Sequence, residues 1–152
     1  MDDATPWTDW RPRVVCLGRA IEALEELTRL HTQRWEGERP GTSLRASSQF
    51  ARHRETIIDS VMEWERVSEA WEGTALAWLA GASRDRRNAR QVDALMLRLQ
   101  EERELRHGLV QDLPVTMPRA SVQLHAVLVA WQAADESLAR DVQRIVSSES
   151  LV

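Results

Sequence analysis

One apolar stripe constrains the fold of this chain more than any other feature of its sequence. Trp64, Trp71 and Trp78 stand seven residues apart, and neighbouring positions continue the same alternating steps of four and three. The aromatic stripe comprises Phe50, Arg54, Ile57, Val61, Trp64, Ser68, Trp71, Ala75, Trp78 and Ala82. Such steps keep side chains on one face of an α-helix. The stripe therefore predicts a single long helix with an aromatic face.

Three more amphipathic segments surround this helix, separated by Gly- and Pro-containing turn signals. We expect helices over about residues 13–36, 48–82, 84–113 and 118–148, with Ser43 or Ser48 capping the second. An arm (1–12) precedes them and a short tail (149–152) follows. No sustained alternation of period two predicts a strand. Because short connections make successive helices antiparallel neighbours, we predict an all-α, single-domain, up-down-up-down four-helix bundle with a long second helix.

Composition narrows the class of protein further. The 152 residues suit one domain, and the single cysteine, Cys16, excludes an intrachain disulfide. The acidic N-terminal residues lack the features of a signal peptide, and no apolar run is long enough to span a membrane. We therefore expect a cytoplasmic protein. All twenty basic residues are arginine, which is typical of a GC-rich bacterial genome, and the net charge of −4 argues against nucleic-acid binding over the whole surface.

The four histidines suggest a metal site, because an antiparallel bundle brings His31, His53, His107 and His125 toward the same end. Neutral imidazoles bind transition metals, and Glu104 with His107 forms the Glu-x-x-His pair that di-iron bundles carry twice. The chain has no second copy of that pair. The candidate ligands are His31, His53, His107 and Glu104. In the alternative, with no metal or other cofactor, two histidines pack in the core and two face water.

A catalytic candidate lies at the start of the last predicted helix. Arg119 and His125 are separated by five residues, which resembles the Arg-to-His spacing of HEPN-type helical ribonucleases. The resemblance covers these two residues, and Ala120 replaces the polar residue that commonly follows the arginine. It implies that His125 acts in general acid–base catalysis while Arg119 stabilises charge on the scissile phosphate.

Four arginines cluster where the second helix turns into the third: Arg84, Arg86, Arg87 and Arg90. We expect Arg11, Arg13, Arg140 and Arg144 at the same end of the bundle. Such an end can hold an anion, nucleic acid or an acidic partner. In the alternative, it is a solvated end neutralised by nearby Asp residues.

Three charged residues interrupt the apolar faces of the last two helices. Glu102 and Arg106 form an i,i+4 pair on the inward face of the third helix, and Asp135 lies mid-stripe on the fourth. Buried charges cost several kcal/mol unless they are paired, so we expect them to meet partners or water. They either fix the helix register or line a groove for another chain.

The length of the second helix suggests how the protein works. It outruns the first by roughly ten residues, or about 15 Å, so part of its stripe lacks a partner there. Either the Trp7–Trp10 arm or another subunit covers this part, for which Trp71, Trp78 and Leu79 are the candidate partner-binding residues. We therefore expect a non-enzymatic interaction module, an adaptor or small subunit of a bacterial assembly that binds a protein or itself. The alternatives are a nucleic-acid-associated subunit, and a ribonuclease or metal-binding bundle.

Overall fold

The computed structural model describes residues 10–36, 43–82, 89–116 and 121–150, and all of these except Trp10 are helical. The four helices are α1 (Arg11–Glu36), α2 (Ser43–Ala82), α3 (Ala89–Thr116) and α4 (Ser121–Ser150). The prediction of an all-α bundle with a long second helix is thus confirmed, since α2 has 40 residues and the others 26 to 30.

The helix ends differ modestly from the predicted ones. Pro12 lies inside the first turn of α1, where its missing N–H removes no helical hydrogen bond. Helix α2 begins at Ser43, the earlier of the two expected caps. Helix α3 continues past Pro114 to Thr116, whereas we expected it to stop at Leu113. The expected starts of the third and fourth helices, at residues 84 and 118, lie outside the described residues.

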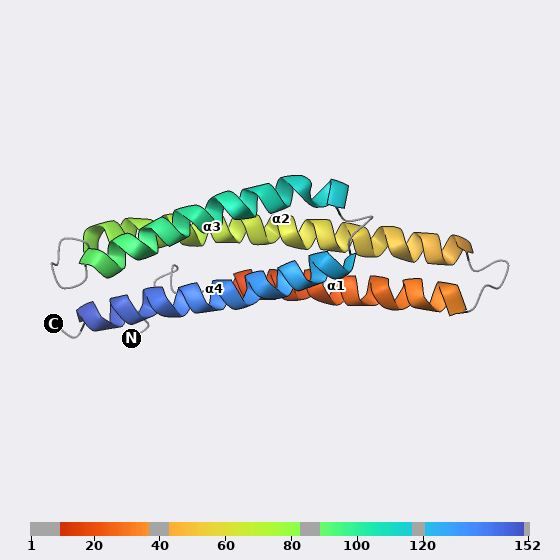
Figure 1. The fold of residues 1–152 in the computed structure, drawn as a ribbon, viewed down its shortest axis with the longest axis horizontal. Coiled ribbons are helices and arrows are strands. Elements are labelled where there is room, and N and C mark those ends of the chain that lie inside the picture. Colours follow the sequence, from red (N-terminus) through yellow and green to blue (C-terminus); the bar gives the residue numbers. More distant parts are fainter. Residues whose placement is uncertain (1–9, 37–42, 83–88, 117–120, 151–152) are drawn as a thin grey trace.

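The helices run antiparallel in chain order but are staggered along the bundle axis (Figure 1). Helix α1 begins about halfway along α2 and extends with its first half, while α3 packs along the second half of α2. Helix α4 contacts α1 and, to a smaller extent, α3. Helix α2 therefore packs mainly against α1 along its first half and mainly against α3 along its second half.

Two separate hydrophobic cores follow from this stagger. The first core consists of Cys16, Leu17, Ala20, Ile21, Ala23, Leu24, Ile57, Val61, Trp64, Leu113, Leu124 and Leu128. The second core consists of Trp71, Ala75, Leu79, Val92, Leu95, Leu99, Leu138, Ala139, Val142 and Ile145. Helix α1 supplies much of the first core and none of the second. The aromatic stripe of α2 contributes residues to both cores, so this one helix connects them.

Leu76, Trp78 and Met96 pack against the second core, and so does Trp10, the residue that precedes α1. Trp10 thus covers part of the region for which we expected either the Trp7–Trp10 arm or another subunit. The other aromatic residue of the arm, Trp7, lies outside the described residues.

None of the helices, over the residues described, is both long and apolar enough to cross a membrane.

Candidate functional site

A layer of buried polar side chains separates the two cores. Arg13, Arg106 and Asp135 are at most 1% exposed, and Ser68 and Glu72 are also buried. We call these five residues, which come from all four helices, the charged layer. In α2, for example, Ser68 lies between Trp64 of the first core and Trp71 of the second. Placing charges in the middle of a bundle is costly unless every charge is paired.

Arg13 is the centre of the charged layer on α1. Its Nε donates to Ser68 Oγ at 3.0 Å, and its Nη2 donates to Asp135 Oδ1 at 2.9 Å. Its guanidinium carbon lies 4.5 Å from the centre of the Trp71 ring, which is a cation–π distance. Burial lowers the pKa of Arg13, and the nearby Asp135 and Glu72 carboxylates oppose that shift. Arg13 thus ties α1 to both α2 and α4.

The interior position of Arg13 corrects our expectation that it lies with Arg11, Arg140 and Arg144 at one end of the bundle. Helix α1 starts midway along the bundle, so Arg13 in its first turn contacts α2 and α4 rather than water. Arg140 and Arg144 do stay on the surface, where they pair with Glu136 and Asp141 on their own helix.

Asp135 completes this part of the charged layer from α4. Its second oxygen, Oδ2, accepts a hydrogen bond from Trp64 Nε1 at 2.7 Å. Burial raises the pKa of Asp135, while the Arg13 charge and the Trp64 hydrogen bond act in the opposite direction. Both oxygens of the carboxylate therefore have a partner on a different helix.

Arg106 holds α3 to α2. Its two terminal nitrogens bind the two oxygens of Glu72, at 2.8 Å for Nη2–Oε2, and its Nε donates to Glu65 Oε2 at 2.5 Å. Burial lowers the pKa of Arg106, but the Glu72 and Glu65 carboxylates outweigh it and raise the pKa overall. A forked pair of this kind fixes both distance and orientation between helices.

Glu102 faces the same interior, but its carboxylate has fewer hydrogen-bond partners than that of Asp135. Burial, reinforced by Asp135, raises its pKa to about 7. Glu102 Oε2 has no hydrogen-bond partner among the described residues, and neither do Arg13 Nη1 and Trp71 Nε1. The expectation that Glu102, Arg106 and Asp135 would be buried and paired is thus met in full by Arg106 and Asp135 and in part by Glu102.

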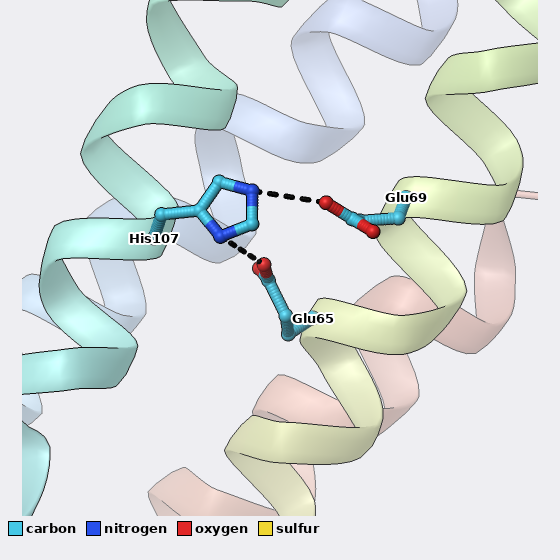
Figure 2. Close-up of side chains that lie close together, drawn as sticks. All are labelled: Glu65, Glu69 and His107. Atoms are coloured by element: carbon cyan, nitrogen blue, oxygen red, sulfur yellow. Dashed lines mark ion pairs between the residues drawn. The ribbon is translucent and has the colours of Figure 1, made fainter.

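A second group of ionisable residues adjoins the charged layer on the α2–α3 surface. Figure 2 shows Glu65 and Glu69 of α2 on either side of the imidazole of His107, which comes from α3. His107 Nδ1 lies 2.7 Å from Glu65 Oε1, and His107 Nε2 lies 2.9 Å from Glu69 Oε1. We call these three residues the Glu–His cluster. Among the described residues, they are the group of His, Cys, Asp and Glu whose ligand atoms, all within 4.8 Å of one another, can hold a metal ion.

Local helix geometry explains why the Glu–His cluster forms. Glu65 and Glu69 are four residues apart and share one face of α2, and Arg103 and His107 are related in the same way on α3. Because the two helices are antiparallel, Glu65 lies opposite His107 while Glu69 lies opposite Arg103. Arg103 Nη2 is 3.3 Å from Glu69 Oε1. The cluster is therefore part of a row in which acidic residues of α2 face basic residues of α3.

His107 presents one ring nitrogen to each of the two carboxylates, at 2.7 Å from Glu65 and 2.9 Å from Glu69. A neutral imidazole has one N–H and can donate to one of them, whereas an imidazolium can donate to both. A cation at this position satisfies the same two oxygens. The arrangement is thus suited to a bound metal ion.

The structure does not bring the predicted metal ligands together as a set. His107 meets Glu65 and Glu69, while Glu104 is exposed on the same helix. His125 Nε2 lies 3.0 Å from Glu25 Oε1, away from that cluster. His53 is half-buried, and the side chain of His31 lies outside the described residues. The stagger of α1 against α3 is the physical reason, since it separates helix ends that an unstaggered bundle would align.

The predicted partner-binding residues lie largely inside the molecule. Leu79 is fully buried and Trp71 is 5% exposed, both in the second core, and Trp78 packs partly against that core. We expected this part of α2 to be covered by the arm or by another subunit, whereas Trp71 and Leu79 are covered mainly by α3 and α4, with Trp10 beside them in the same cluster.

The remaining site candidates fall mostly outside the described part of the chain. Arg84, Arg86, Arg87 and Arg119 are not among the described residues, and Arg90 is exposed. The anion-binding and ribonuclease hypotheses that use these arginines stay predictions.

Sequence reasoning did not select Glu65 and Glu69. Their signal was available in the hairpin register, because an antiparallel pair with its turn near residue 85 places residue 107 opposite residue 65. The sequence hypothesis combined His107 with Glu104 on its own helix and with the other histidines, and it did not include Glu65 or Glu69.

A scan against protein-family models and searches of curated proteins and of solved structures find no match to this chain. Fold and side-chain geometry define it as an all-α four-helix bundle with a charged interior layer.

Proposed function

We propose that the protein is a non-enzymatic helical interaction module that self-associates through the outer face of α4. The observation that supports this most is the absence of charge on that face. Between Arg119 and Asp135 the sequence has no Asp, Glu, Lys or Arg, although such residues make up 29% of the chain. A solvent-facing helix surface normally carries charged residues, so this segment is unusual for a face that meets water alone.

The exposed side chains of this segment are apolar. Val127 and Val129 are 39% and 43% exposed. Ala126, Ala130 and Ala133 are exposed as well, at helical steps of four and three. Small side chains let another helix approach closely, because the distance between helix axes depends on the residues at the contact.

The occupant we propose is the same face of a second copy. An uncharged face with a row of alanines is complementary to itself, as the twofold symmetry of a homodimer requires. A charged partner helix would have to lose water from its charges without gaining counter-charges here. The patch is narrow, so we expect a concentration-dependent dimer of modest affinity.

Light scattering coupled to gel filtration, over ten to several hundred micromolar, tests this proposal. We expect a concentration-dependent rise toward the dimer mass for the wild type, and monomers for Val129→Glu and Ala130→Glu. Met62→Glu is the matched control, because Met62 is 57% exposed on α2 and outside this face. A wild type that stays monomeric throughout, or a dimer unaffected by both α4 variants, would contradict self-association through α4.

We also propose a cytoplasmic location, because the single cysteine is a buried free thiol rather than part of a disulfide. Nucleic-acid binding through the arginine cluster is the alternative function class. A gel shift that weakens steeply with salt would support it, since phosphate contacts release counterions.

A further inference from the structure

We propose that the Glu–His cluster is a binding site for one divalent transition-metal ion, with Glu65, Glu69 and His107 as its protein ligands. This inference is independent of self-association, because the cluster lies on the α2–α3 surface and the proposed dimer face lies on α4. One imidazole nitrogen and two carboxylate oxygens form a donor set that suits zinc and its neighbours in the first transition row.

The ligand atoms already lie near the required distances. Zinc bonds of about 2.0–2.2 Å place neighbouring ligand atoms roughly 3.5 Å apart. The three ligand atoms of the cluster lie within 4.8 Å of one another, so closing on an ion takes a small side-chain movement. Glu69 and His107 have side chains 40% and 44% exposed, which leaves them room to rotate. His107 then turns one ring nitrogen toward the point between the two carboxylates.

Arg106 leaves one oxygen of Glu65 available to an ion, and Arg103 contacts the His107-facing oxygen of Glu69 only through an exposed pair. Arg106 binds Glu65 through Oε2, which leaves Oε1, the atom that faces His107. Arg106 is also held by both oxygens of Glu72, so the charge of Glu65 is not needed to balance it. Arg103 contacts Glu69 at 3.3 Å and is 54% exposed, so this pair is readily exchanged.

The site is anchored on one side and open on the other. Glu65 has a side chain only 16% exposed, and the buried Arg106 fixes its orientation. Anchoring of a ligand by a hydrogen bond from behind is the usual arrangement in metal sites. Three protein ligands leave at least one coordination position for water.

Calorimetric titration of the full-length, chelator-treated protein with zinc tests the proposal. We expect one zinc ion per chain, and at least tenfold weaker binding for Glu69→Gln and for His107→Ala, since even outer partners of a metal site change affinity by about 10–100-fold. Circular dichroism checks that both variants remain folded, which their exposure favours. His125→Ala is the matched control, because it removes an imidazole that faces a single carboxylate, Glu25.

A third variant tests the role of Glu69 in the opposite direction. Arg103→Gln removes a positive charge beside the proposed ion, so zinc binding should become roughly threefold tighter. Binding that is unchanged or weaker in this variant would place the ion away from Glu69. The proposal is overturned if the wild type takes up no zinc, or if His107→Ala and Glu69→Gln bind it as the wild type does.

Discussion

The charged layer and the Glu–His cluster use the same kinds of side chain, but they differ in exposure to solvent. Arg13, Arg106 and Asp135 are at most 1% exposed, whereas the His107 side chain is 44% exposed. The two regions share one contact, because Arg106 binds Glu65 from inside while His107 binds it from outside. The two regions thus differ mainly in burial, which determines how costly it is to remove one partner of an ion pair.

Because the charged layer is buried, each of its charges must stay paired for the fold to be stable. Removing one partner of a buried pair leaves an uncompensated charge and costs about 3–5 kcal/mol, whereas an exposed pair contributes about 0–1 kcal/mol. The more exposed pairs of the Glu–His cluster can therefore exchange partners at little cost. The buried layer cannot exchange partners in this way.

The charged layer also specifies how the helices align. Its members come from four helices, and Arg13 alone bridges Ser68 of α2 and Asp135 of α4. Sliding any helix by one turn would separate these groups by about 5.4 Å and leave buried charges unpaired. We therefore infer that the layer fixes the stagger which the two hydrophobic cores alone leave less well defined.

The largest expected effect comes from breaking the charged layer at Asp135. Asp135→Ala removes the acceptor of both Arg13 and Trp64, so we expect a loss of about 4–5 kcal/mol in the free energy of unfolding. Urea denaturation followed by tryptophan fluorescence measures it.

Two further variants control for this effect. Asp135→Asn keeps an acceptor and should lose less. Glu136→Ala breaks the exposed pair with Arg140 on the same helix and should cost less than about 1 kcal/mol. Equal losses for Asp135→Ala and Glu136→Ala would show that burial does not distinguish the two kinds of pair.

An intermediate effect is expected at Glu102, which borders the charged layer. Its pKa of about 7 in the folded state exceeds the ordinary 4.5, so the folded protein holds this proton more tightly than the unfolded chain does. The protonated form thus stabilises the fold at low pH, and that contribution is lost as pH rises from about 4.5 to 7. Glu102→Gln cannot lose the proton, so its advantage over the wild type should grow across this window.

We expect that growth to reach about 1–2 kcal/mol once screening by solvent at the partly exposed carboxyl is allowed for. Urea denaturation at pH 4 and pH 8 measures it. Glu101→Gln is the control, because Glu101 is the exposed neighbour on α3. Stability curves that stay parallel for Glu102→Gln and the wild type would mean that Glu102 titrates as an exposed residue does.

The sequence predicted the helices better than their stagger. The steps of three and four in α2 correctly indicated burial of Ile57, Val61, Trp64, Ser68, Trp71 and Ala75. The interrupting charges Arg106 and Asp135 were likewise expected to be buried and paired. Periodicity reports which face of a helix is buried, but it does not report which helix covers that face.

The part of the site that the sequence did not predict depends on which helix covers each buried face. Arg13 was expected with Arg11, Arg140 and Arg144 at one end of the bundle. Its burial follows from where α1 begins along α2, which is a property of the whole bundle. The pairing of His107 with Glu65 and Glu69 likewise needs the register of α2 against α3.

The smallest effect is expected at the Glu–His cluster. In the presence of a chelator, His107→Ala should lower the free energy of unfolding by less than about 1 kcal/mol, although it removes two short contacts to carboxylates. Water solvates Glu65 and Glu69 when the imidazole is absent, and Arg106 and Arg103 remain beside them. Urea denaturation of the chelator-treated protein measures this change. A loss of about 3 kcal/mol or more would mean that the cluster is energetically part of the buried layer, because only a desolvated pair costs that much when one partner is removed.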